Sequence, residues 1–90
     1  MSSKSLTIPV RVLTDAVESV ITVEMKSGEL YRGKLLDVEG SMNCYLESVT
    51  KTERDGKVTT LVQVFLRGSH IRLFILPELL KHSRVLKGGI

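Results

Sequence analysis

The sequence predicts a mainly β protein, in which a short N-terminal helix precedes a five-stranded, strongly bent antiparallel sheet that forms a small open barrel. Three observations support this fold class. Two dense apolar runs, residues 58–66 and 71–76, follow each other closely in the second half of the chain. The Asp55-Gly56 pair, a strong hairpin signal, stands just before the first run. Gly33 interrupts an earlier apolar run and offers a place for a strand to bend.

The N-terminal part of the chain predicts one helix and one strand. Apolar residues recur at helical spacing behind Pro9, a residue that suits the first turn of a helix, and we expect a helix over about 9–17. From residue 19 the apolar period changes to two, which predicts a first strand over about 19–26. A helix this short is marginal alone, so it must pack its apolar side against the sheet.

Four further strands follow, separated by glycine-containing turns. Ser27-Gly28 and Gly40-Ser41 bound the second strand, and Asp55-Gly56 joins the third strand to the fourth. The expected strands cover about 19–26, 29–39, 42–54, 57–67 and 70–76, and a segment over 77–90 with one more short helix at about 78–87 ends the chain. We expect the whole chain, 1–90, to be a single domain.

The last two strands carry apolar side chains on both faces. Regular alternation places Leu61 and Phe65 on the face opposite Leu66, and Phe74 on the face opposite Ile71. A sheet with one face in water would alternate apolar and polar residues, so each face must be covered. An open barrel also has two free edges, and we therefore expect strand addition between copies or related chains.

The amino-acid composition limits the partners and the cellular compartment that we expect for this chain. The 13 basic and 10 acidic residues give a net charge of +3, which mildly favours polyanionic partners. Cys44 is the single cysteine, so the chain forms no internal disulfide and no cysteine-based zinc site, as in a reducing compartment. No apolar run is long enough to span a bilayer and no targeting segment is evident, so we expect a soluble intracellular protein without a membrane partner.

The sequence contains no recognisable set of catalytic residues. There is no hydroxyl or thiol with a plausible histidine and carboxylate set, and no glycine-rich phosphate loop. His70 and His82 lie far apart and have no carboxylate at ligand spacing, which argues against a metal site. We therefore expect a protein that is not an enzyme and that uses no cofactor and no metal.

Two groups of residues, in order and at matching spacing, resemble the two signatures of the Sm and Sm-like RNA-binding family. The first group is Gly33-x-Leu35, Glu39, Met42-Asn43 and Leu46, and the second is Leu66-Arg67-Gly68 followed by Ile71. Glu39 stands where most of the family has aspartate. The resemblance covers about residues 8–86, nearly the whole chain.

The resemblance implies a ring of related subunits, a heptamer, in which strand four of one subunit pairs with strand five of the next. Such a ring binds uridine-rich single-stranded RNA at its central hole and forms the core of the spliceosomal small nuclear ribonucleoproteins, in the nucleus after assembly in the cytoplasm. Two alternatives stay open. The chain could belong to an Sm-like ring in RNA decay or RNA chaperoning, or it could be a barrel that binds only protein.

Four residues are the predicted RNA contacts that the resemblance implies: Ser41, Asn43, Arg67 and Gly68. Asn43 offers a donor and an acceptor that match the edge of uracil, and Arg67 offers a guanidinium plane and a positive charge. Gly68 leaves the backbone open to close approach. Ser41 stands where many relatives place an aromatic residue or histidine that stacks on a base. Without the resemblance, Asn43 would be read as a turn-capping side chain and Arg67 as a rim charge.

Overall fold

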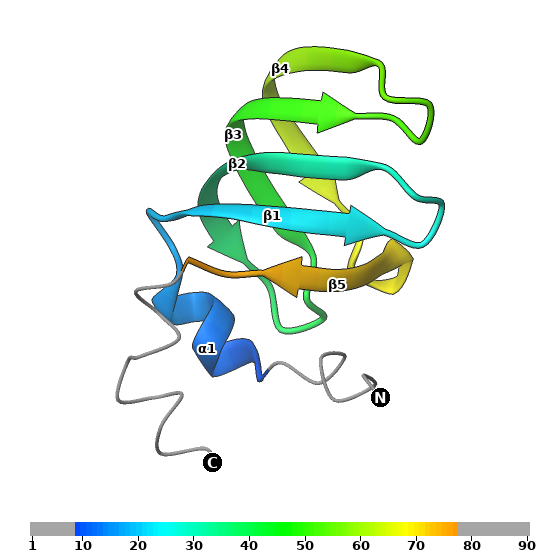
Figure 1. Cartoon of the computed structure of the whole chain (residues 1–90). Coiled ribbons are helices and arrows are strands. Elements are labelled where there is room, and N and C mark those ends of the chain that lie inside the picture. Colours follow the sequence, from blue (N-terminus) through cyan, green and yellow to red (C-terminus); the bar gives the residue numbers. More distant parts are fainter. Residues whose placement is uncertain (1–8, 78–90) are drawn as a thin grey trace.

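One helix, five strands and one 3-10 turn make up the part of the chain that the computed structural model describes, residues 9–77 (Figure 1). The elements are α1 (Val10–Asp15), β1 (Val20–Met25), β2 (Leu30–Val38), β3 (Cys44–Thr52), β4 (Val58–Leu66), η2 (Gly68–His70) and β5 (Ile71–Ile75). The strands pair antiparallel in the order β4-β3-β2-β1-β5, so β4 and β5 are the two edges. The predicted fold class is confirmed, and the helix expected at about 78–87 lies outside the described residues.

Gly33 lies near the middle of β2, a strand that curves strongly along its length (Figure 1). The β2–β3 register shifts beside it because β3 contains one extra residue there, and Ser48 takes a φ of +54°. A Cβ on residue 33 would lie 2.9 Å from the carbonyl oxygen of Glu47 and 3.0 Å from Val49 Cγ2. Glycine therefore lets the two backbones approach closely enough for the sheet to curl.

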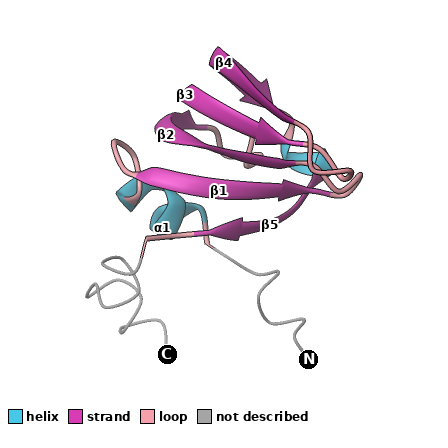
Figure 2. Cartoon of the chain, turned by 45° about the horizontal axis from the view of Figure 1, so that its top comes forward, coloured by secondary structure: helices cyan, strands magenta, loops and turns pink. Residues whose placement is uncertain are grey.

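The core is enclosed between the curved sheet and α1, which lies on the β1–β5 side of the sheet in both views (Figures 1 and 2). Its buried members come from the helical region and all five strands: Leu13, Ala16, Ile21, Val23, Met25, Leu35, Cys44, Leu46, Val49, Leu66 and Ile71. Burial raises the pKa of the Cys44 thiol to about 12, so at neutral pH this group is an un-ionised member of the core.

The side chains of β4 do not follow regular alternation. Leu61 and Leu66 both pack against the core, although alternation places them on opposite faces. The reason is the bend in β3 at Ser48, which β4 follows because the two strands stay in register across it. The expected assignment of faces in β4 is therefore wrong on one side of the bend.

A second irregularity changes the faces of β5. Ile71 pairs with Met25 and Phe74 pairs with Val23, so the β5 strand has one residue more than β1 between these pairs. Ile71 and Phe74 consequently both pack on the core, although alternation predicts opposite faces. Ile75 is left 48% exposed on the outer side of this edge strand.

Candidate nucleic-acid interface

The turn between β2 and β3 is closed by its own backbone. The Glu39 N–H donates to the carbonyl oxygen of Asn43 at 2.9 Å, and the Met42 N–H donates to the carbonyl oxygen of Glu39 at 2.8 Å. Met42 takes a φ of +73°, which no regular strand residue adopts. β3 therefore begins at Cys44, and not at residue 42 as the sequence predicted.

The turn after β4 lies directly beside this β2–β3 turn, because β3 and β4 remain paired to their ends. Cys44 pairs with Leu66 at the end of the two strands. Asn43, which precedes Cys44, and Arg67, which follows Leu66, are therefore neighbours at this end of the sheet. η2 follows at once, and the His70 N–H donates to the carbonyl oxygen of Arg67 at 2.9 Å. The two sequence signatures meet at this point.

Gly68 is the residue that lets the two turns touch. A Cβ on residue 68 would collide with the carbonyl oxygen of Ser41 and would lie 2.9 Å from the carbonyl carbon of Met42. Backbone atoms in a closed turn cannot move aside as a flexible side chain can. Any side chain at position 68 would therefore separate the turns.

The amide of Asn43 has a single defined orientation in this setting. The Gly68 N–H donates to Asn43 Oδ1 at 2.6 Å, and Asn43 Nδ2 donates to Glu39 Oε1 at 2.8 Å. An N–H group can only donate and a carboxylate can only accept, so the two partners distinguish the oxygen from the nitrogen. One N–H and one lone pair of the half-buried amide are left for a ligand.

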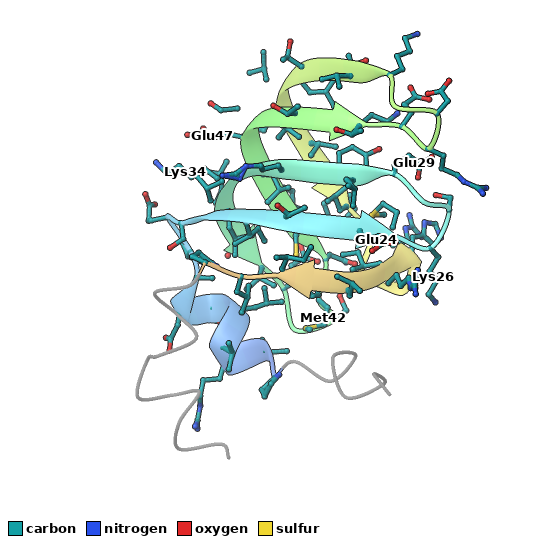
Figure 3. All side chains as sticks on the ribbon, viewed as in Figure 1. Glu24, Lys26, Glu29, Lys34, Met42 and Glu47 are labelled. Atoms are coloured by element: carbon teal, nitrogen blue, oxygen red, sulfur yellow. The ribbon has the colours of Figure 1, made fainter. Side chains whose placement is uncertain are left out.

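Arg67 and Ser41 are both exposed beside this amide. Within the described residues Arg67 forms no salt bridge. Lys34, by contrast, pairs with Glu18 at 3.1 Å and with Glu47 at 3.8 Å. Figure 3 shows that Lys34 lies away from Met42, a residue of the β2–β3 turn. The structure thus brings the four predicted site residues together and leaves the Arg67 guanidinium free of ion pairs among residues 9–77.

Two further residues belong to this arrangement. Glu39 belongs to the first sequence signature, but it is not among the predicted RNA contacts. Its Oε1 accepts a hydrogen bond from the Asn43 amide, and its Oε2 accepts one from the Tyr45 hydroxyl at 3.3 Å. Tyr45 is not among the predicted RNA contacts either. Its only sequence signal is its position two residues after Asn43, which places the two on the same side of an extended chain.

Residues 9–77 hold no group of three or more histidine, cysteine, aspartate or glutamate side chains that could bind a metal ion. In the same part of the chain, no helix has the length and apolar character needed to cross a bilayer. The polar groups at the two turns offer hydrogen bonds, the positive charge of Arg67 and a backbone open to close approach.

Comparison with known proteins defines the class. The sequence matches the LSM domain over residues 11–76, most of the chain. The chain therefore belongs to the LSM domain family, the family of Sm and Sm-like proteins.

Within the family the chain is similar to Sm D3 proteins. It is 49% identical over 85 residues to the small nuclear ribonucleoprotein SmD3b of Arabidopsis thaliana, an alignment that covers 94% of this chain and 65% of the plant protein. It is 38% identical to Sm D3 of Schizosaccharomyces pombe, covering 93% and 87% of the two chains. The chain spans just under two thirds of the length of the plant relative.

Solved structures support the fold. An Sm protein of Pyrococcus abyssi, solved in complex with a uridine heptamer, superposes with a TM-score of 0.71 at 18% sequence identity. The match covers 79% of this chain and 100% of the archaeal one. At this identity the likeness concerns the fold alone.

Proposed function

We propose that this chain is a non-enzymatic subunit of a heteromeric Sm ring that binds uridine-rich single-stranded RNA in the core of spliceosomal small nuclear ribonucleoproteins. The observation that carries the proposal is the contact between the two turns, which orients the Asn43 amide beside Arg67. The names of the D3 relatives and the uridine bound to the archaeal protein support it.

Each site residue has a separate part in holding RNA. The free N–H and lone pair of Asn43 complement the O4 acceptor and N3–H donor of uracil. Arg67 stacks its guanidinium plane on a base and attracts phosphate. Gly68 keeps the turn surface open to the strand, and Ser41 adds an exposed hydroxyl on the same turn.

Assembly uses the two sheet edges, with β4 of one subunit pairing with β5 of the next. In the single chain the β4 edge leaves Val62 89% and Phe65 44% exposed. Near the other edge, Ile75 of β5 is 48% exposed, and together with Val20 of β1 it lines a hollow of about 510 Å³ over the paired strands. Apolar side chains and open backbone groups at both edges favour strand addition, which would close a ring, taken from the family to be a heptamer.

This role places the chain in the nucleus, within the small nuclear ribonucleoproteins. We extend the proposal to assembly of the ring on RNA in the cytoplasm before import. Fractionation of cells with a tagged chain, together with identification of the chains that co-purify, tests both parts. Recovery without other Sm subunits or small nuclear RNA would count against the proposal.

The direct test compares RNA sequences on an assembled ring. The chain is co-expressed with the Sm subunits that co-purify with it, and the ring is titrated with oligouridine and oligoadenine of equal length. We expect clearly tighter retention of oligouridine. Equal retention of both, or none, by an intact ring would favour the reading of a barrel that binds only protein.

A further inference from the structure

Glu39 uses both oxygens of its carboxylate, and the second one contacts Tyr45. Oε1 accepts a hydrogen bond from Asn43 Nδ2 at 2.8 Å, and Oε2 accepts one from the Tyr45 hydroxyl at 3.3 Å. The Tyr45 ring packs on Phe65 with ring centroids 4.8 Å apart and planes tilted by 51°, and the two residues pair across β3 and β4. These contacts link the paired strands to Asn43 through Glu39.

The Tyr45 contact restrains a side chain that would otherwise be free to move. Glu39 is exposed, and an exposed glutamate loses conformational entropy when it is held in one rotamer. Tyr45 is fixed by its strand and by Phe65, so its hydroxyl offers a donor at a constant place. Desolvation, followed by the charge of Glu39, raises the pKa of Tyr45, so the hydroxyl keeps its proton and donates at neutral pH.

The orientation of the Asn43 amide decides which pyrimidine it matches. Uracil presents the O4 acceptor next to the N3–H donor, whereas cytosine presents the N4 amino donor next to the N3 acceptor. An amide matches the reversed pattern once it turns by half a rotation and exchanges its oxygen and nitrogen. The Gly68 N–H and the Glu39 carboxylate oppose that rotation, because both hydrogen bonds would be lost.

We propose that Tyr45 is a positioning residue that holds Glu39 in place, and thereby keeps the Asn43 amide in the one orientation that favours uracil over cytosine. The inference rests on the proposed function, in which Asn43 contacts the base. Tyr45 acts through Glu39 and touches no RNA. Base selection at this subunit then depends on a residue of the β3 strand as well as on the two signatures.

The test removes one oxygen atom. In the assembled ring, Tyr45→Phe deletes the hydroxyl and keeps the aromatic packing on Phe65. Affinities are measured for short oligonucleotides that carry uridine or cytidine at the position placed at this subunit by crosslinking. We expect the ratio of uridine to cytidine affinity to fall by about threefold, with unchanged thermal stability of the ring.

Tyr31→Phe is the matched control. Tyr31 is also half-buried, but its hydroxyl makes no hydrogen bond within residues 9–77. In the variant, the aromatic ring at position 31 keeps its contact with Lys51 Nζ, which lies 5.7 Å from the ring centroid. Its affinity ratio should equal that of the wild type. A second readout is exchange of the Asn43 side-chain amide protons with water, which should become faster in Tyr45→Phe and not in Tyr31→Phe.

Asn43→Ala separates the inference from the function on which it rests. If Asn43→Ala loses the uridine preference while Tyr45→Phe keeps both the wild-type ratio and the wild-type exchange rate, the positioning role is overturned and the proposed function stands. If the wild-type ring shows no preference for uridine, or Asn43→Ala keeps it, the proposed base contact is overturned and the positioning role with it.

Discussion

β1 and β4 are both apolar strands, yet their surroundings differ completely. In β1, Ile21 and Val23 are almost fully buried and alternate with side chains that face outward. In β4 only Leu66 is buried, and Val62 is 89% exposed. An interior strand such as β1 or β2 is paired on both sides within its own chain, whereas the edge strand β4 can be paired on its free side only by another chain. Changes at the centre should therefore break the fold, and changes at the edge should break assembly.

Gly33→Val tests the central half of this comparison and should have the largest effect. The added side chain meets the Glu47 carbonyl and Val49, so we expect the free energy of unfolding to fall by about 3 kcal/mol, although valine is the better strand former. Gly40→Val is the control, because no atom lies within 4 Å of the Cβ it would add. Urea unfolding measures both, and equal stability of the two variants would show that Gly33 is incidental.

Val62→Lys tests the edge. Because the side chain is solvated in the single chain and covered in the proposed ring, the subunit should fold normally but bind its neighbour roughly tenfold or more weakly. Val58→Lys, at the hairpin end of the same strand, should have a smaller effect, since a lysine there can extend into water. Sedimentation of the reconstituted assembly reports both. Normal assembly of Val62→Lys would contradict pairing through β4.

Asn43→Ala tests the β2–β3 turn, which lies between the interior of the sheet and its β4 edge. We expect the preference for uridine over cytidine at one position to shrink by about 1 kcal/mol or more, because the polar edge of the base loses its partner. Binding of short crosslinked oligonucleotides to the intact ring measures the preference. An unchanged preference would remove Asn43 from the set of base contacts.

Arg67→Ala should act differently in kind and more weakly on selectivity. Loss of one cation should weaken binding to every sequence and lower the slope of log affinity against log salt by about 1. Arg72→Ala is the control, because that guanidinium already pairs with Glu24 at 3.2 Å. Titrations over a series of salt concentrations give the slope, and the same slope in all three proteins would exclude a phosphate contact at Arg67.

Cys44 should have an effect only in alkaline solution, where it reports whether the paired end of β3 is dry. The folded thiol keeps its proton up to a pKa of about 12, whereas the unfolded thiol ionises near 9.0. The stability it contributes is therefore full below pH 9.0 and is lost as the pH rises through about 12. Cys44→Ala should flatten the decline of unfolding free energy above pH 9.0. An equally steep decline in the variant would mean that the thiol is hydrated.

The order of elements could be predicted from the sequence because turns such as Asp55-Gly56 and changes of apolar period are local signals. The directions of Leu61 and Phe74 could not. In β3 the bulge does leave a mark, because Val49 falls out of step with Cys44 and Leu46, but nothing in the apolar pattern of β4 or β5 shows that their faces change. The meeting of Asn43 and Gly68 follows from the two signatures. The contact between Glu39 and Tyr45 depends on the conformation of one flexible side chain, which no spacing rule specifies.

The contact between Gly68 and the β2–β3 turn also limits how chain length can vary. One added residue between Glu39 and Asn43 would move the Ser41 carbonyl into or away from Gly68. It would thereby break the hydrogen bond from the Gly68 N–H that orients the Asn43 amide. The β3–β4 hairpin carries no such constraint, since no atom lies within 4 Å of a Cβ built on Gly56. Insertions, affinity tags and crosslinkable loops should therefore be accepted at the hairpin tip and rejected at the turn that holds Asn43.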